Sequence, residues 1–184
     1  MNTRVALAAL LAFALTTRAS AEIEASDNRG FHINLTTLVE VNPARAYQAL
    51  TEDIGQWWNA DHTYSGDASN LSMDFERHCL LEKLPDNGFV RHMEIVFHQP
   101  GKTLRLTGGL GPLQGMGVGG AMTFSLSPED NRTKVEFTYI VSGYVPAGLK
   151  EIAPAVNRVL EEQLANFQRF CDSERKAPVL ESDR

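Results

Sequence analysis

Apolar and polar residues alternate along much of the chain, which is the pattern of β-strands with one buried face. The first alternating stretch begins at Phe31 and continues to about Val39. Similar stretches follow at about 71–76, 78–84, 89–98, 103–108, 121–127 and 133–142. Several of the turns between them are short and rich in glycine, asparagine, aspartate and proline, so we expect antiparallel neighbours within one sheet.

Two short helices are predicted between the first strand and the second. Asn42 and Pro43 open the first helix, which runs to about Thr51, because asparagine caps helix N-termini and proline fits the first helical turn. The second covers about 53–58. Near the C-terminus, apolar residues recur every three or four positions, which predicts one long amphipathic helix at about 152–172. The apolar stripe begins at Leu149, just before the helix, and continues with Ile152, Val156, Leu160, Leu164 and Phe167.

This order of elements predicts an α+β fold. One strand, two short helices, six antiparallel strands and a long helix describe a strongly bent sheet of about seven strands wrapped around the last helix. Both the concave sheet face and the helix face that it surrounds are apolar. We therefore expect a ligand-sized apolar cavity between them.

The N-terminal residues are typical of a secretory signal peptide. A basic start is followed by an apolar run of eleven residues from Val5 to Leu15, and then by the small residues Ala19-Ser20-Ala21. We expect cleavage after Ala21, a periplasmic or secreted protein, and no stable membrane insertion once the signal peptide (1–21) is removed. The other predicted parts are a flexible leader at 22–30, a ligand-binding domain at 31–172 and a disordered tail at 173–184.

Charge and cysteine content narrow the possible partners and cofactors. The formal net charge is −6, which argues against nucleic acid and anionic membranes as binding partners. Cys79 and Cys171 either form a disulfide or remain two buried thiols, and the sequence leaves both alternatives open. The sequence has no cysteine and histidine array of the kind that binds structural zinc, and we expect no cofactor and no metal.

Several segments resemble the START and Bet v 1-like (SRPBCC) superfamily, which includes polyketide cyclases and Aha1-type domains, and most closely its exported, polyketide cyclase/dehydrase-like bacterial members. The similar segments are residues 41–50, 54–58, 91–94, 104–116, 139–144 and 154–167. The resemblance implies a helix-grip fold. It also implies binding of a lipid-like, polyketide-like or aromatic small molecule between the sheet and the last helix, but no particular catalyst.

A glycine-rich segment at 108–120 holds seven of the fourteen glycines, and 115–120 reads G-x-G-x-x-G. A dinucleotide-binding fingerprint leads into a helix, whereas the residues after this one alternate as a strand. We therefore interpret the segment as a mobile flap that places Leu110, Leu113 and Met116 over the cavity. The alternative is a long hairpin connection without a ligand role.

Alternation along the strand at 89–98 places Arg91, Met93 and Phe97 on the concave face. Arg91 either reaches water, pairs with a local carboxylate such as Glu82, or binds the polar end of an otherwise apolar ligand. The same alternation places His92 and Glu94 on the other face. There we expect a solvated strand surface rather than a metal or acid–base site.

Aromatic residues complete the predicted ligand contacts. We expect one of Trp57 and Trp58 in the core and the other at the cavity mouth, and Tyr139 as a hydrogen-bond donor to the ligand. The full predicted set is Trp57, Trp58, Arg91, Met93, Phe97, Leu110, Leu113, Met116, Phe124, Phe137, Tyr139, Val156 and Leu160. No catalytic residue is predicted, because the sequence contains no G-x-S-x-G elbow and Asp61-His62 is an isolated pair in a polar loop.

The predicted function is that of a carrier or sensor for an apolar or aromatic small molecule, with a non-enzymatic role favoured. Two alternatives remain. One is a cyclase or dehydratase acting on such a ligand, and the other is an Aha1-like domain that binds another protein.

Overall fold

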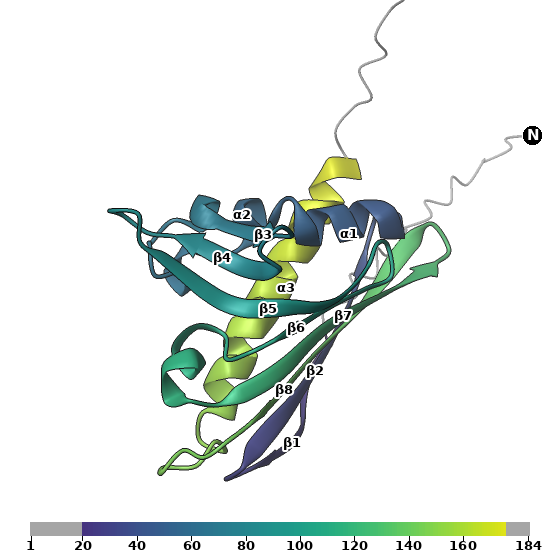
Figure 1. Cartoon of the computed structure of the whole chain (residues 1–184). Helices are drawn as coiled ribbons and strands as arrows, with labels where there is room; N and C mark the ends of the chain where they lie inside the picture. The colour runs from purple at the N-terminus through teal and green to yellow at the C-terminus, as the bar shows by residue number, and fades with distance from the viewer. Residues whose placement is uncertain (1–19, 176–184) are drawn as a thin grey trace, which may run out of the picture.

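The structure, a computed structural model, describes residues 20–175 and consists of one bent antiparallel sheet packed on a long helix (Figure 1). The sheet has eight strands in the order β1-β2-β8-β7-β6-β5-β4-β3. The strands are β1 (Ser20–Asp27), β2 (Gly30–Val39), β3 (Leu71–Asp74), β4 (Cys79–Lys83), β5 (Phe89–Gln99), β6 (Thr103–Thr107), β7 (Gly119–Glu129) and β8 (Arg132–Ser142). This arrangement confirms the predicted α+β class and helix-grip architecture.

Three α-helices and three 3-10 segments complete the described part of the chain. The helices are α1 (Pro43–Thr51), α2 (Ile54–Trp57) and α3 (Ala153–Arg175), and the 3-10 segments are η1 (Ala60–His62), η2 (Ala68–Asn70) and η3 (Gly111–Met116). The Asn42 side chain accepts a hydrogen bond from the Arg45 amide at 2.9 Å, so the predicted cap opens α1. Within residues 20–175 no helix is both long enough and apolar enough to cross a bilayer.

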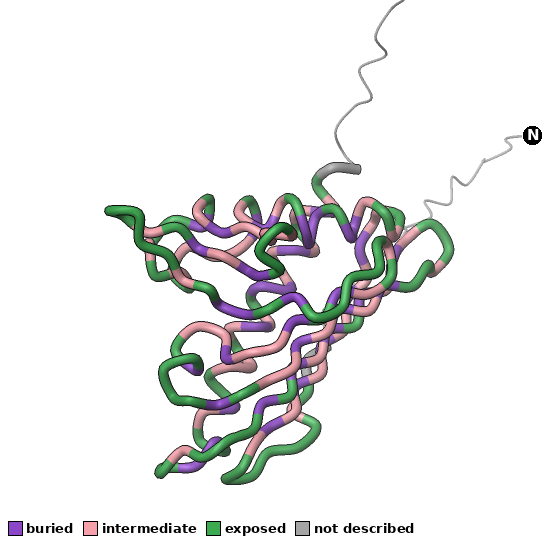
Figure 2. Tube along the Cα trace, in the orientation of Figure 1, coloured by how far each residue is buried: buried purple, intermediate pink, exposed green. Residues whose placement is uncertain are grey.

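The core lies between the concave face of the sheet and α3. Along β2 every second residue is buried, and Figure 2 shows the same alternation of buried and less buried positions along the neighbouring strands. From α3 the core receives Leu160, Leu164 and Phe167. The ring of Phe167 meets that of Trp57 from α2 edge to face, at 5.3 Å between centroids, which fixes the short helix against the long one.

The prediction of a flexible leader at 22–30 is wrong, because most of these residues belong to strand β1. This strand pairs with β2 from Ser20↔Thr36 to Asp27↔Gly30, so the sheet has one strand more than predicted. Backbone hydrogen bonds to β2 hold a strand at the sheet edge even where its side chains are mostly polar. The carboxylate of Asp27 also accepts hydrogen bonds from the Arg29 and Gly30 amides and closes the turn.

The two predicted terminal segments fall largely outside the described residues. The signal peptide lies within residues 1–21, of which only Ser20 and Ala21 are described, and both are in β1. The predicted tail begins at residue 173, where α3 still continues to Arg175. Cys79 and Cys171 are both buried and are not joined by a disulfide. Of the two states that the sequence left open, the structure therefore contains two buried thiols.

Candidate functional site

A cavity of about 410 Å³ lies between the sheet, the N-terminal half of α3 and two surface segments, one of them η3. Its volume falls within the range of about 300–1,000 Å³ that is usual for small-molecule sites. Most of its walls are apolar. The lining residues are Trp58, Asp61, His62, Thr63, Tyr64, Leu71, Leu80, His92, Leu110, Gly111, Pro112, Leu113, Met116, Ile152, Ala155, Val156, Val159 and Leu160.

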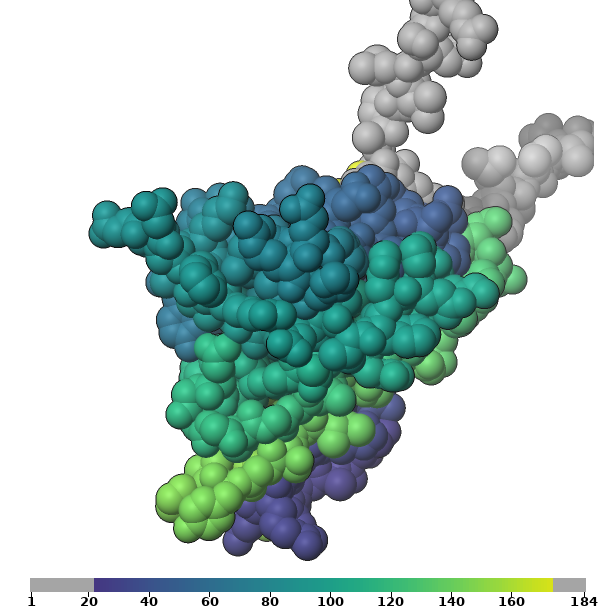
Figure 3. All heavy atoms as spheres, viewed as in Figure 1, coloured from purple at the N-terminus to yellow at the C-terminus, as the bar shows by residue number. Residues whose placement is uncertain are grey.

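The glycine-rich segment forms one wall of this cavity through η3. The 3-10 turn begins at Gly111 with Pro112 in its first turn, and Gly117, with a φ of 69°, ends it in the left-handed region that favours glycine. The segment projects at the surface below the β4–β5 hairpin (Figures 1 and 3). It leads directly into β7, so the G-x-G-x-x-G sequence opens no helix and has no dinucleotide-binding geometry.

Six of the thirteen predicted ligand contacts line the cavity. They are Trp58, Leu110, Leu113, Met116, Val156 and Leu160. Three others, Trp57, Phe124 and Phe137, border a second hollow of about 20 Å³, which is too small for an organic ligand. Met93 is a core residue with 2% exposure.

The face predicted for Arg91 and Phe97 is wrong, because β5 contains two β-bulges. The register changes between Leu80↔Met93 and Leu81↔Arg91, and again between Ile95 and Phe97, and each change inserts one extra residue in β5. An extra residue reverses the alternation of the strand beyond it. Phe97 is therefore 45% exposed on the outer surface, where the Arg105 guanidinium lies 5.7 Å from the ring centroid.

Arg91 also lies outside the cavity. Its guanidinium pairs with Glu94 at 3.2 Å and donates a hydrogen bond to the Arg77 carbonyl at 3.3 Å. The carboxylate that pairs with Arg91 is therefore Glu94 and not Glu82. An ion pair this exposed contributes about 0–1 kcal/mol to stability. The Arg91 guanidinium does not line the cavity, so it is not placed to bind a ligand there.

Tyr139 is fully buried and binds the backbone of the glycine-rich segment. Its hydroxyl donates to the Gly108 carbonyl at 3.1 Å and accepts from the Leu110 amide at 3.0 Å. Burial raises the pKa of Tyr139 to about 12, although the Leu110 amide acts in the opposite direction. With both hydrogen bonds made inside the protein, this hydroxyl holds the entry to η3 in place instead of facing a ligand.

Polar contacts between η1 and α3 lie at the rim of the cavity. The Glu162 carboxylate accepts from the Asn59 side chain at 2.5 Å and lies 3.2 Å from the His62 ring. Hydrogen bonds from Asn59 and then His62 hold the pKa of Glu162 below its ordinary value. The indole of Trp58 donates to the His62 carbonyl at 3.2 Å, so the whole loop is tied to the long helix.

Solved structures share this architecture at low sequence identity. A conserved protein of unknown function from Enterococcus faecalis matches over 90% of this chain and 82% of its own, with 15% identity and a TM-score of 0.54. CalU16 from Micromonospora echinospora matches over 90% and 88%, with 14% identity and a TM-score of 0.53. The Aha1 dimer structure from Colwellia psychrerythraea matches over 77% and 96%, with 21% identity and a TM-score of 0.53.

The chain has the helix-grip fold. The resemblance to the START and Bet v 1-like superfamily is thereby confirmed at the level of fold. No protein-family model and no curated protein matches the sequence. The function of this helix-grip chain therefore has to be argued from its own cavity.

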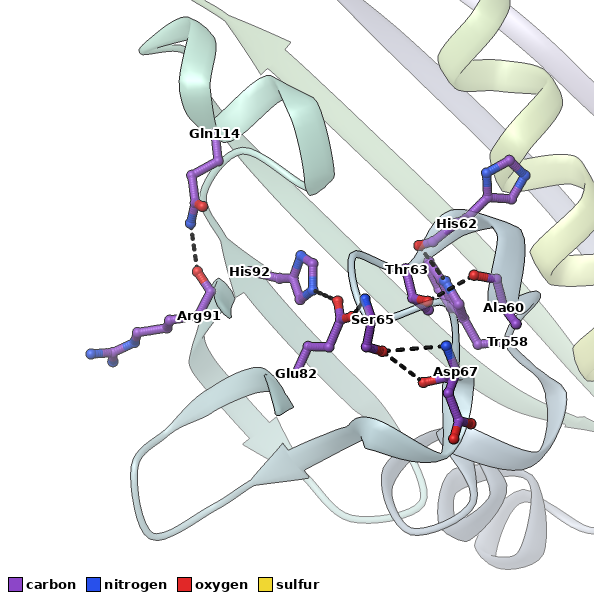
Figure 4. A network of polar contacts seen from close by, with 10 residues as sticks. All are labelled: Trp58, Ala60, His62, Thr63, Ser65, Asp67, Glu82, Arg91, His92 and Gln114. Carbon is purple, nitrogen blue, oxygen red and sulfur yellow. Dashed lines mark hydrogen bonds and ion pairs between the residues drawn. The ribbon is translucent and has the colours of Figure 1, made fainter. Parts of the chain in front are cut away.

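The helix-grip cavity contains one buried polar pair that sequence reasoning missed. Glu82 of β4 and His92 of β5 are 0% and 5% exposed, and the ring Nε2 lies 2.8 Å from the carboxylate Oε2 (Figure 4). The first bulge in β5 turns His92 inward, which corrects the prediction of a solvated histidine. The available signal was in β4, where alternation places Glu82 on the same face as the buried Leu80.

The carboxylate of Glu82 is held in its charged form by the loop after η1. Burial raises its pKa, but hydrogen bonds from the Ser65 amide, the His92 ring and the Tyr64 amide outweigh burial and hold the pKa below the ordinary value. The Ser65 amide donates to Oε1 at 2.5 Å. Among residues 20–175 no group of three or more histidine, cysteine, aspartate or glutamate side chains could hold a metal ion. The arrangement is therefore an apolar cavity with a buried carboxylate–imidazole pair in its wall.

Proposed function

We propose that this protein binds an apolar or aromatic small molecule, lipid-like or polyketide-like, in the cavity beneath α3, as a carrier or sensor. The observation that carries the proposal is the cavity of about 410 Å³ with mostly apolar walls. A well-packed core has few voids larger than a water molecule, so a hollow of this size is not a packing defect of the usual kind.

The cavity supports moderate affinity for a ligand of one or two rings. A ligand of roughly 15 heavy atoms that gains about 0.4 kcal/mol per atom binds with about 6 kcal/mol. That free energy corresponds to a Kd of roughly 40 µM. An extra hydrogen bond or a better-fitting ring system would tighten binding further.

Export is part of the proposal. The basic start, apolar run and small-residue site at the N-terminus support a periplasmic or secreted protein. In that compartment a carrier would take up its ligand from the extracytoplasmic solution.

A cyclase or dehydratase acting on such a ligand is the second candidate, favoured by one observation. The Glu82–His92 pair combines a carboxylate and an imidazole, the groups that most often serve as general acid and base. A protein-binding role, by analogy with Aha1-type domains, is the outcome that remains if the cavity binds nothing.

The test is binding of a fluorescent apolar dye, N-phenyl-1-naphthylamine, together with native mass spectrometry of the purified protein. Val156→Trp fills part of the cavity and is expected to weaken dye binding at least tenfold. The matched control is Ile140→Trp, because Ile140 is 49% exposed on β8, and this variant should bind the dye like the wild type.

Equal dye binding by the two variants would refute the cavity as the binding site. Absence of dye binding and of any co-purifying small molecule would refute the proposed function itself. Turnover of an identified ligand would select the enzymatic candidate.

A further inference from the structure

The Glu82–His92 pair is the one place where the apolar cavity wall offers a buried ionisable side chain. His92 lines the cavity and is 5% exposed, while the Glu82 carboxylate behind it is fully buried. Tyr64 stacks on the His92 ring with centroids 5.9 Å apart and 23° between the planes. The pair therefore lies between the sheet and the loop that follows η1.

The direction of the hydrogen bond within the pair follows from its surroundings. A carboxylate has only acceptor atoms, and the Ser65 amide already donates to Oε1 at 2.5 Å. The hydrogen between Oε2 and the ring, 2.8 Å apart, must therefore lie on Nε2 of His92. In the neutral imidazole this tautomer leaves Nδ1 with a free lone pair.

This second ring nitrogen has no use within the described fold. His92 Nδ1 is buried, and no residue between 20 and 175 forms a hydrogen bond with it. Figure 4 shows it pointing away from Glu82. A buried acceptor without a donor costs free energy, and that cost is recovered when a donor reaches it.

We propose that the Glu82–His92 pair is a hydrogen-bond-accepting site that binds the hydroxyl group of the cavity's ligand. The ligand class is an apolar, preferably aromatic, compound with one hydroxyl, such as a phenol. The hydroxyl donates its hydrogen to Nδ1 and no covalent bond is made or broken. This inference rests on the proposed function, because it names the polar group of the molecule that the cavity takes.

The charge of the site excludes anionic head groups. The buried Glu82 carboxylate contributes a negative charge directly behind the ring, and Asp61 adds another at the cavity lining. His62 is the other histidine at the lining, and it already pairs with Glu162. A carboxylate ligand would therefore be repelled, whereas a neutral hydroxyl would be polarised by the pair.

Tyr64 stacks on one face of the imidazole, whereas the Nδ1 lone pair lies in the plane of the ring. Tyr64 is 55% exposed and lies in the loop between η1 and η2. A half-exposed side chain in a loop changes rotamer on a time scale of nanoseconds and at little cost. An aromatic ligand can replace its stacking contact with the His92 ring.

The test uses three probes of matched shape: 1-naphthol, 1-methylnaphthalene and 1-naphthoate. We expect the wild-type protein to bind 1-naphthol about tenfold more tightly than 1-methylnaphthalene, a difference of about 1.4 kcal/mol, and to bind 1-naphthoate most weakly. Isothermal titration calorimetry measures the three dissociation constants.

Glu82→Gln is the decisive variant, because it reverses the tautomer. The glutamine oxygen still accepts from Ser65, while its NH2 group donates to Nε2 of His92, so Nδ1 must carry the hydrogen. The preference for 1-naphthol over 1-methylnaphthalene should then weaken, because the naphthol oxygen can accept from Nδ1–H only as a weak acceptor, and 1-acetylnaphthalene, which only accepts, should bind more tightly than to the wild type. The control is Glu94→Gln, which changes an exposed carboxylate on β5 and should keep the wild-type order.

His92→Phe keeps an aromatic ring and removes both nitrogens, so 1-naphthol and 1-methylnaphthalene should bind equally. A second readout needs no ligand, since ¹⁵N spectra of the histidine rings, assigned with this variant, report the tautomer directly. A wild-type His92 that carries hydrogen on Nδ1 would overturn the proposal.

The outcomes separate this inference from the proposed function. Equal binding of 1-naphthol and 1-methylnaphthalene by the wild type overturns the hydrogen-bond-accepting site and leaves the apolar cavity as the binding site. Binding of neither probe overturns both.

Discussion

Removal of the Tyr139 hydroxyl should loosen the glycine-rich segment without disturbing the core around the ring. Tyr139→Phe keeps the ring, which lies edge to face with Phe31 at 6.3 Å between centroids. It deletes the oxygen that joins the Gly108 carbonyl to the Leu110 amide, at 3.1 and 3.0 Å. These two residues lie immediately before η3, which forms one wall of the cavity.

The expected cost follows from the burial of this hydroxyl. A hydrogen bond contributes a net of about 0.5–1.5 kcal/mol, and a buried partner left without one costs about 1–3 kcal/mol. The segment lies near the surface, so water can reach part of the freed backbone. We therefore expect a loss of about 2 kcal/mol in the free energy of unfolding, or roughly 4–8 °C in Tm for a domain of this size.

Two measurements check this prediction. Urea unfolding should give a lower midpoint with an unchanged m value. Hydrogen exchange should become faster at the Leu110 amide and through η3, while exchange in β2 stays as in the wild type. The control is Tyr144→Phe, because Tyr144 is 84% exposed and its hydroxyl should contribute nothing measurable. Unchanged exchange at Leu110 in Tyr139→Phe would show that this hydroxyl does not hold the segment.

Three further predictions concern acid stability, the core and the glycines. The folded-state pKa of Glu82 lies below the ordinary value of 4.5, so its contribution to stability is fully present above about pH 4.5 and is lost as the pH falls through the folded-state pKa. Glu82→Gln should therefore flatten the acid side of a plot of unfolding free energy against pH, and an unchanged slope would contradict this. Phe167→Ala should cost about 3–5 kcal/mol in urea unfolding because the ring is fully buried. Phe89→Ala, at a position 67% exposed, should stay within about 0.5 kcal/mol of the wild type. Gly120→Ala should lower Tm, since an added Cβ would lie 2.7 Å from the Tyr139 ring, whereas Gly115→Ala meets nothing within 4 Å and should leave Tm unchanged. Equal melting temperatures for the two alanine variants would refute the close approach at Gly120.

Local patterns in the sequence were sufficient for most elements and for their order. Alternation predicted β2, β7 and β8 to within a few residues, because strands with one buried face repeat with a period of two. Asn42 and Pro43 marked the start of α1, and the apolar stripe from Ile152 to Phe167 marked α3. These signals are carried by neighbouring residues, so they need no knowledge of what packs against them.

Tertiary contacts decided the details on which the candidate site depends. Alternation within β5 placed His92 outside and Phe97 inside, and the two bulges, which arise from the pairing of β5 with β4 and β6, reversed both. Likewise, β1 is held at the sheet edge by backbone pairing with β2, to which its polar side chains gave no clue. A bulge and an edge pairing are properties of two strands together, and the residues of one strand do not encode them separately. The sequence alone therefore determined a bent sheet around a helix with an apolar interior. Only the folded register brought Glu82 and His92 to 2.8 Å of each other in the cavity wall.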